Sequence, residues 1–285
     1  MQKLSLSIFT ICVIAIANSC SKSSSNTPVP ATPIVPGPGT AQSWSFEATP
    51  SWNDEFEING SPDPGKWDYE TGGSGWGNNE LQYYTRGDNV KQENGQLVIT
   101  AKKEDYNGKD YTSTRLVTNN KAEWLYGRIE IKARLPKGRG TWPALWMFPA
   151  ESFYGTWPKS GEIDIMEHVG YDMNNVHFSI HTEVFNFTIN TQKTSIKYTE
   201  AVADSFHVYR LDWTPYGLRG YIDNVQYFEY INNYSGYKTW PFDQKFFLII
   251  NIAVGGNWGG AQGIDNAAFP ASMNIDYVRY YKFLQ

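Results

Sequence analysis

Apolar and polar residues alternate with a period of two along many short stretches of this chain, and Gly, Pro, Asn and Asp bound these stretches. A period of two is typical of a strand with one buried and one exposed face, and no comparable stretch has the sustained 3.6-residue period of an amphipathic helix. Residues 246–254 are almost continuously apolar, which predicts a central strand covered on both faces. The clearest alternating stretches are 97–102, 127–134, 176–181, 206–213 and 275–281.

Many short strands separated by turns predict an all-β fold in which two antiparallel sheets pack as a β-sandwich or jelly roll, with little helix. From Trp44 to the last residue, Gln285, the composition does not shift and no internal repeat occurs. The sequence therefore predicts one folded domain over residues 44–285.

The first 20 residues are typical of an export signal. Lys3 supplies a basic start, residues 4–17 are apolar, and small residues precede Cys20. This apolar run is shorter than the roughly 20 residues that cross a bilayer, so a cleaved signal is favoured over a membrane span. The segment 17–20 resembles a bacterial lipobox, although Ala17 stands where a larger aliphatic residue is usual. Cys20 would then be lipidated; ordinary secretion with cleavage nearby is the alternative.

The segment 21–43 is rich in Ser, Thr, Pro and Gly, a composition that buries too little apolar surface to fold. It is predicted to tether the domain to an outer membrane, facing either the periplasm or the cell surface. Cys12 would leave with the signal, so the mature chain would hold at most one cysteine and no internal disulfide.

The chain contains 11 Trp, 19 Tyr and 15 Phe, or 16% aromatic residues. Strands favour such residues, but this number also suggests an exposed groove in which rings pack on the apolar faces of sugars. The net charge of -5 without a basic cluster argues against a nucleic-acid surface and suits a neutral polymer.

The sequence Gly-Glu-Ile-Asp-Ile-Met-Glu at 161–167 contains the strongest candidate chemistry. In a regular strand Glu162 and Asp164 share one face, and Glu167 points into the core. A one-residue β-bulge near Met166 would return Glu167 to the face of the other two acids. Three neighbouring carboxylates repel one another, so at least one should have a raised pKa and hold a proton, as a general acid must. A solvated acidic strand face is the alternative interpretation.

This segment resembles the active-site motif of glycoside hydrolase family 16, in the bulged form of its laminarinase-like branch. The resemblance runs from about Trp52 to Tyr281 and includes the segments 77–84, 111–116, 140–147, 251–258 and 276–279. It implies a jelly roll with a concave cleft and an endo-acting, retaining β-glucan hydrolase that needs no cofactor for catalysis. By this resemblance Glu162 would be the nucleophile, Asp164 the assisting acid and Glu167 the acid/base.

The same resemblance implies the residues that bind sugar and a structural calcium ion. Trp142 and Trp146 would stack sugar rings, although each is also a candidate for core packing. The other sugar-binding candidates are Asn79, Arg115, His181 and Trp258. A calcium ion on the convex side would be held by Glu55, Gly95 and Asp276, since calcium prefers oxygen ligands.

Three functions remain open from the sequence. An endo-β-1,3-glucanase acting as a monomer on β-glucan is favoured, and a mixed-linkage glucanase or a galactanase of the same family is the alternative. A non-catalytic glucan-binding module is disfavoured, because binding-only family members typically lack the catalytic acids that this chain retains.

Overall fold

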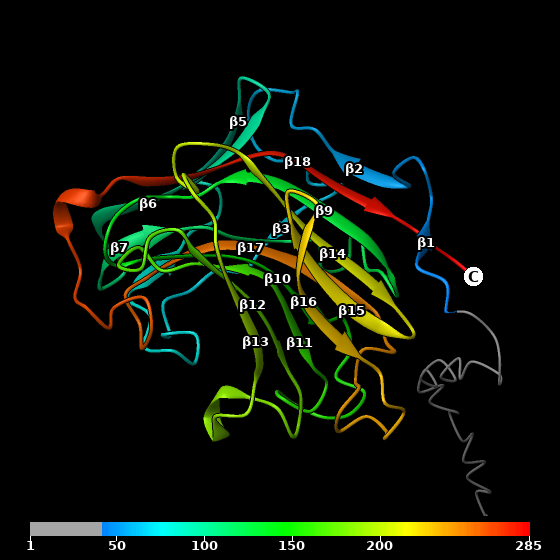
Figure 1. Ribbon diagram of the computed structural model, residues 1–285. Helices are drawn as coiled ribbons and strands as arrows, with labels where there is room; N and C mark the ends of the chain where they lie inside the picture. Colours follow the sequence, from blue (N-terminus) through cyan, green and yellow to red (C-terminus); the bar gives the residue numbers. More distant parts are fainter. Residues whose placement is uncertain (1–41) are drawn as a thin grey trace, which may run out of the picture.

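The computed structural model describes residues 42–285 and confirms the predicted all-β sandwich (Figure 1). The predicted signal, Cys20 and nearly all of the tether lie outside the described residues. Within them the only helical elements are two short 3-10 helices, η1 (Phe187–Ile189) and η2 (Asn266–Ala268). No helix in this part of the chain has the length and apolarity that a membrane crossing requires.

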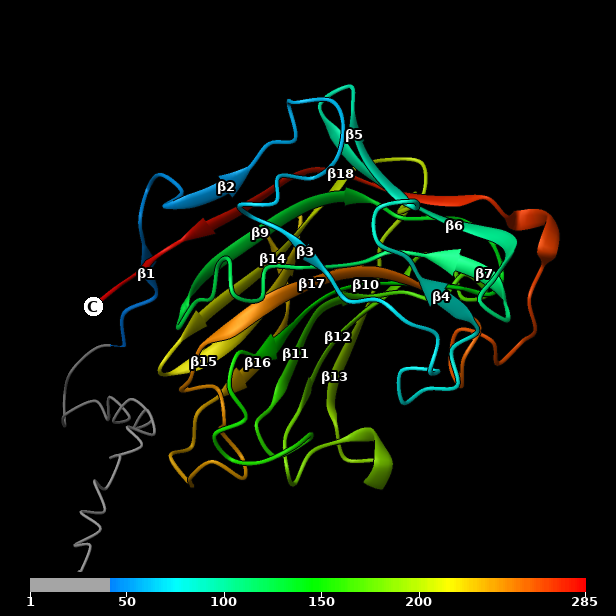
Figure 2. The same ribbon diagram turned by 180° about the vertical axis from the view of Figure 1, so that it is seen from behind.

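Two large curved sheets form the layers of the sandwich (Figures 1 and 2). The seven-stranded sheet has the order β13 (Lys193–Tyr198), β12 (Asn175–His181), β11 (Glu162–Glu167), β10 (Thr141–Pro149), β17 (Phe246–Val254), β8 (Arg115–Val117), β3 (Asp68–Tyr69).

The ten-stranded sheet has the order β16 (Val225–Ile231), β15 (Gly217–Ile222), β14 (His207–Thr214), β9 (Gly127–Arg134), β18 (Ala271–Tyr281), β6 (Gln96–Tyr106), β7 (Lys109–Ser113), β4 (Gln82–Tyr84), with β2 (Trp52–Asp54) on β18 and β5 (Val90–Glu93) on β6. A separate pair, β1 (Ser45–Phe46) and β19 (Phe283–Leu284), joins the two ends of the described chain. The pairing of β4 with β7 is parallel, whereas the other strand pairs are antiparallel, as predicted.

The core lies between the sheets and is built from the inward residues of each alternating strand. On β9, for example, Ile129, Ile131 and Ala133 are fully buried, and the polar residues between them are partly exposed. All nine residues of β17 are buried, as its apolar sequence predicted. Its two faces have different partners: Leu248 and Ile250 belong to the main core, while Phe247 and Ile249 pack in a smaller cluster on the outer face.

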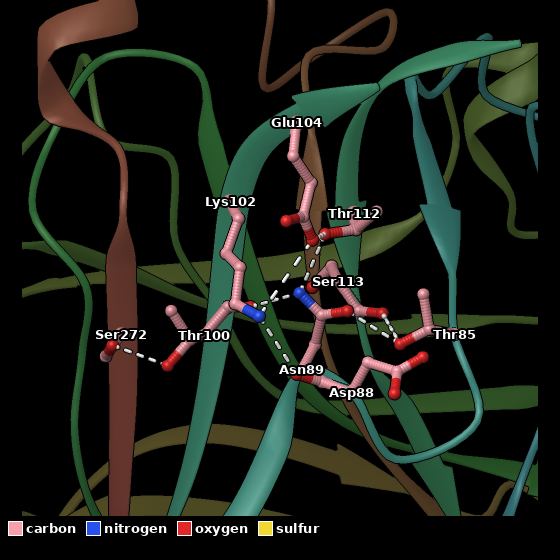
Figure 3. Close-up of polar contacts among 9 residues, drawn as sticks. All are labelled: Thr85, Asp88, Asn89, Thr100, Lys102, Glu104, Thr112, Ser113 and Ser272. Carbon is pink, nitrogen blue, oxygen red and sulfur yellow. Dashed lines mark hydrogen bonds and ion pairs between the residues drawn. The ribbon is translucent and has the colours of Figure 1, made fainter. Parts of the chain in front are cut away.

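A polar network holds the start of β5 against β6 and β7 (Figure 3). The buried Asn89 side chain donates to the Thr100 carbonyl at 2.9 Å and to Thr112 Oγ1 at 2.8 Å, and it accepts from Thr85 Oγ1 at 2.6 Å. Thr85 directly follows β4, so these bonds fix the end of that strand. Gln82 and Tyr84 of β4 in turn accept hydrogen bonds from β17 of the seven-stranded sheet.

Candidate active site

A cleft of about 820 Å³ crosses the outer face of the seven-stranded sheet. Side chains from β8, β10, β11, β12, β13 and β17 line it, together with loops before β4 and after β17. The three predicted acids, Glu162, Asp164 and Glu167, all line this cleft.

A β-bulge in β11 brings the three acids to one surface, as predicted. Met166 pairs with Leu145 of β10 and Asp164 pairs with Trp146, so Ile165 is the extra residue without a partner of its own. Ile165 and Met166 are both buried in the core, at 1% and 0% exposure. The extra residue resets the alternation, and Glu167 therefore turns outward instead of into the interior.

His181 of β12 faces two of these acids. Its Nε2 lies 3.3 Å from Asp164 Oδ2 and 3.8 Å from Glu162 Oε1. The third acid has a different partner, because Trp142 of β10 donates its indole Nε1–H to Glu167 Oε1 at 3.0 Å. Neighbouring strands thus hold each carboxyl group in place.

Burial perturbs the ionisation of all three acids. Desolvation raises the pKa of Glu162 to about 8; Asp164 adds to the rise, while His181 and Arg115 oppose it. Desolvation likewise raises the pKa of Asp164 to about 8, against a hydrogen bond with Glu162 that lowers it. The prediction of raised pKa values in this cluster is therefore supported.

Glu167 has the same kind of shift but different neighbours. Desolvation raises its pKa to about 8, the Asp164 charge adds to the rise, and the Trp142 hydrogen bond lowers it. Because the ionised form of a carboxyl group in this cleft is disfavoured, Glu167 holds its proton near neutral pH, which suits a general acid.

Arg115 provides a fixed positive charge on the other side of the catalytic strand. Its guanidinium group lies between the rings of Trp76 and Trp146, at 4.8 and 4.6 Å from their centroids. Glu70 pairs with it through a hydrogen bond at Nε. Stacking and pairing restrict the guanidinium group to one orientation, with its remaining N–H groups as donors for a ligand in the cleft.

A further buried acid, Glu80, lines the cleft and was not identified from the sequence. It accepts hydrogen bonds from Gln82 Nε2 at 2.6 Å and from Tyr84 OH at 3.2 Å. Tyr84 OH in turn accepts from Asn251 Nδ2 at 3.0 Å, and Asn251 Oδ1 accepts the indole N–H of Trp146 at 2.7 Å. This chain of bonds connects β4, β17 and β10 beneath the cleft.

Comparison with known proteins gives this arrangement a family. The chain matches the model described as "Glycosyl hydrolases family 16" over residues 77–279. The chain belongs to glycosyl hydrolase family 16. It is 52% identical over 244 residues to the "Beta-glucanase" of Rhodothermus marinus, covering 82% of this chain and 85% of that protein.

A second relative and a solved structure are also similar to this chain. The "Glucan endo-1,3-beta-glucosidase" of Cryptopygus antarcticus is 40% identical over 231 residues, which cover 75% of this chain and 83% of that protein. The X-ray structure of the laminarinase from Rhodothermus marinus superposes with a TM-score of 0.83 at 49% identity, covering 84% of this chain and 99% of that chain. These similarities confirm the family that the motifs indicated.

The predicted sugar-binding residues of this family 16 member lie mostly in the cleft. Trp142, Trp146, Arg115, His181 and Trp258 all line it. The Trp142 and Trp258 rings meet edge to face, 5.4 Å between centroids.

Asn79 lies next to the lining residues of the cleft, and its predicted role in sugar binding stays a prediction. It has a positive φ of 57° and is exposed, and its side chain donates to Asn257 Oδ1 at 2.9 Å. The neighbouring Asn78 and the acceptor Asn257 line the cleft instead. The left-handed backbone at Asn79 turns the chain, and the hydrogen bond from its side chain helps to fix Asn257.

Sequence reasoning missed several other lining residues, among them Trp76, Trp157, Phe187 and Asn251. Three of these lie outside the strands or at their ends, where long-range packing decides orientation. A signal was available for Asn251 alone, since it is a polar residue inside an otherwise apolar strand.

The predicted calcium ligands lie near one another on the ten-stranded sheet. β18 pairs with β2 through Val278 and Asp54 and with β6 through Ile275 and Leu97, which brings the predicted ligands to one part of the sheet. Both predicted carboxylates already have cationic partners, however. Arg279 donates two hydrogen bonds of 2.8 Å to Glu55, and Lys132 Nζ lies 2.7 Å from Asp276 Oδ2.

These ion pairs do not exclude the predicted ion, because it would be held largely by backbone carbonyl oxygens and by one carboxylate. Gly95 occupies the turn between β5 and β6 with a φ of +71°, and it would contribute its carbonyl oxygen. To bind a calcium ion here, the Asp276 carboxylate would have to leave Lys132 and coordinate the ion together with carbonyl oxygens.

Proposed function

We propose that this protein is a retaining, endo-acting β-1,3-glucanase that uses Glu162 and Glu167 as its catalytic pair. The observation that carries the proposal is the bulge at Ile165, because it places both glutamates in one open cleft on the same strand. An open cleft admits a polymer along its length, which suits cleavage of internal linkages.

In the proposed first step, a Glu162 carboxylate oxygen attacks the anomeric carbon while Glu167 gives its proton to the departing glycosidic oxygen. The bond to the leaving sugar breaks and a glycosyl ester forms on Glu162. In the second step, Glu167 takes a proton from water as that water attacks the same carbon and releases Glu162. Two inversions restore the starting configuration.

The neighbours of each acid support these roles. Burial raises the pKa of Glu162 to about 8, and Arg115 and His181 oppose this rise, so both side chains increase the share of the ionised nucleophile at neutral pH. Asp164 lies between the two glutamates in sequence and raises the pKa of both, which keeps a proton within the cluster. We assign Asp164 to this role of holding and sharing the proton.

Substitution of each glutamate tests the assignment. Glu162→Gln and Glu167→Gln should each lower kcat on laminarin by a factor of at least about 10³, as expected for loss of a covalent or proton-transfer step. Reducing-sugar release measures kcat, and circular dichroism checks the fold. Release at the wild-type rate from a folded Glu162→Gln protein would refute the role of Glu162.

A preference for β-1,3 linkages is supported by the two relatives whose names specify laminarinase or endo-1,3 activity. The alternative is mixed-linkage β-1,3/1,4-glucan or a galactan, and the name of the 52% identical relative leaves the linkage open. Product profiles from laminarin, barley β-glucan and agarose distinguish these possibilities. Cleavage of agarose alone would contradict the glucanase proposal.

Calcium binding by Glu55, Gly95 and Asp276 also belongs to the proposal. An ion that binds only the folded chain raises its unfolding temperature. Thermal unfolding in CaCl2 and in EDTA should therefore differ, and the Asp276→Asn variant should lose the difference. Equal unfolding temperatures in the two buffers would contradict a calcium site.

We further propose that the chain is a monomeric lipoprotein of the outer membrane, anchored through Cys20 and facing either the periplasm or the cell surface. The support is the apolar segment before Cys20 and the Ser- and Pro-rich segment after it. Fractionation of cells that express the wild-type and Cys20→Ser proteins tests the anchor, since only the wild type should stay with the membrane. Size-exclusion chromatography with light scattering tests the monomer.

A further inference from the structure

His181, Glu162 and Asp164 form one cluster among the residues that line the cleft. Asp164 is 3% exposed, and its Oδ2 has no hydrogen-bond partner within residues 42–285. That oxygen nevertheless lies 3.3 Å from His181 Nε2. A buried acceptor without a partner is costly, so a species that binds both groups would be stabilising here.

The spacing of the three side chains fits a tetrahedral metal ion. Zinc binds imidazole nitrogen and carboxylate oxygen at roughly 2.0–2.2 Å, which places neighbouring ligand atoms of a tetrahedron about 3.3–3.6 Å apart. His181 Nε2 lies 3.3 Å from Asp164 Oδ2 and 3.8 Å from Glu162 Oε1. One atom from each of the three residues lies within 4.8 Å of the others, an arrangement found in no other His, Cys, Asp and Glu group of the described chain.

The orientation of the His181 ring permits this coordination. His181 is 6% exposed, and its Nδ1 has no hydrogen-bond partner among the described residues. Nε2 faces the Asp164 carboxylate, so it can either donate a proton to that oxygen or, with its proton on Nδ1, offer its lone pair to an ion held between them.

We propose that Glu162, Asp164 and His181 form a binding site for a divalent transition metal ion of the zinc class, and that the bound ion blocks the cleft. Three protein ligands leave the fourth position of a tetrahedral ion open to water. An ion held there occupies the carboxylate oxygens of Glu162, so a sugar cannot approach them. The blocking effect rests on the proposed role of Glu162, whereas the binding does not.

Isothermal titration of the full chain with ZnCl2 tests the binding. The wild type should bind zinc, and His181→Asn should bind it more weakly by at least about 10-fold, since loss of a group that only supports a ligand already costs that much. The matched control is His177→Asn on the same strand, which should retain the wild-type affinity. Asp164→Asn serves as a second ligand variant, with circular dichroism as the check that each variant is folded.

Wild-type zinc affinity in both folded ligand variants, or absence of zinc binding by the wild type, would overturn the proposal. The blocking effect has a separate kinetic test. Zinc should raise the KM for laminarin without lowering kcat, and EDTA should restore the KM. Zinc that binds through His181 but leaves the KM unchanged would refute the block, and this result would leave the hydrolase assignment intact.

Discussion

Replacement of the buried Glu162 by Gln should stabilise the fold near neutral pH. Burial raises the pKa of Glu162 from an ordinary 4.5 to about 8, so folding disfavours its ionised form. Below about pH 4.5 the carboxyl group is neutral in both the folded and the unfolded chain, and it costs nothing. As the pH rises from 4.5 toward 8, the unfolded chain releases the proton and the folded chain keeps it, so stability falls through this window.

The magnitude follows from the shift. Each pKa unit corresponds to about 1.4 kcal/mol, and pH 7 lies about 2.5 units above the ordinary pKa, which sets an upper limit of roughly 3.5 kcal/mol. Gln does not ionise and therefore avoids this cost, but its amide group fits the site less well. We expect Glu162→Gln to raise the free energy of unfolding by about 1–3 kcal/mol at pH 7. For a domain of this size, each kcal/mol raises the unfolding temperature by roughly 2–4 °C.

Denaturant unfolding of wild type and Glu162→Gln at about pH 4 and pH 7 measures this effect, with a difference near zero at the lower pH. Glu55→Gln is the matched control with the opposite sign. A hydrogen bond from Arg279 lowers the pKa of Glu55, so its removal should cost about 0.5–1 kcal/mol at pH 7 and less as the pH falls. A Glu162→Gln protein that is no more stable than wild type at pH 7 would refute the reasoning.

Two further substitutions near Glu167 and one in the core test other parts of the structure. Trp142→Phe removes the hydrogen bond that lowers the pKa of Glu167. The alkaline limb of the pH profile of kcat/KM should therefore move to higher pH, and a shift to lower pH would contradict the assignment of Glu167 as the acid. Glu80→Gln removes a charge that raises the same pKa, so that limb should move to lower pH, and an unchanged limb would show that Glu80 does not influence the acid. Gly220→Ala should destabilise the fold by about 1–3 kcal/mol in denaturant unfolding, because the added Cβ would lie 2.4 Å from Phe178 Cδ2. A variant as stable as wild type would show that the two sheets can separate at this point.

The sequence predicted those features that depend on local alternation. The strand at 127–134 and the two-faced strand at 246–254 have the predicted bounds, because their burial follows directly from residue type. The bulge was predictable for a related reason. Three acids at 162, 164 and 167 share one face only if one residue is added to the strand, and Ile165 is that residue.

The sequence did not predict contacts that depend on long-range packing. Glu80, Tyr84 and Asn251 come from segments far apart in the chain, and only the packing of β4 against β17 joins their side chains. The calcium prediction shows the same limit. The resemblance that implied Glu55 and Asp276 gives no information on Arg279 and Lys132, which the folded sheet places beside these two acids.

Rescue by azide tests the division of roles between the two glutamates most directly. With an aryl laminari-oligosaccharide as substrate, azide should restore turnover to Glu162→Ala by entering the face that the nucleophile has vacated, which gives an α-glycosyl azide. With Glu167→Ala, azide should attack the glycosyl ester on Glu162 and give the β-glycosyl azide. Proton NMR of the anomeric position distinguishes the two products. Opposite anomers in this order are the predicted result, and the same anomer from both variants, or the reverse order, would contradict the account.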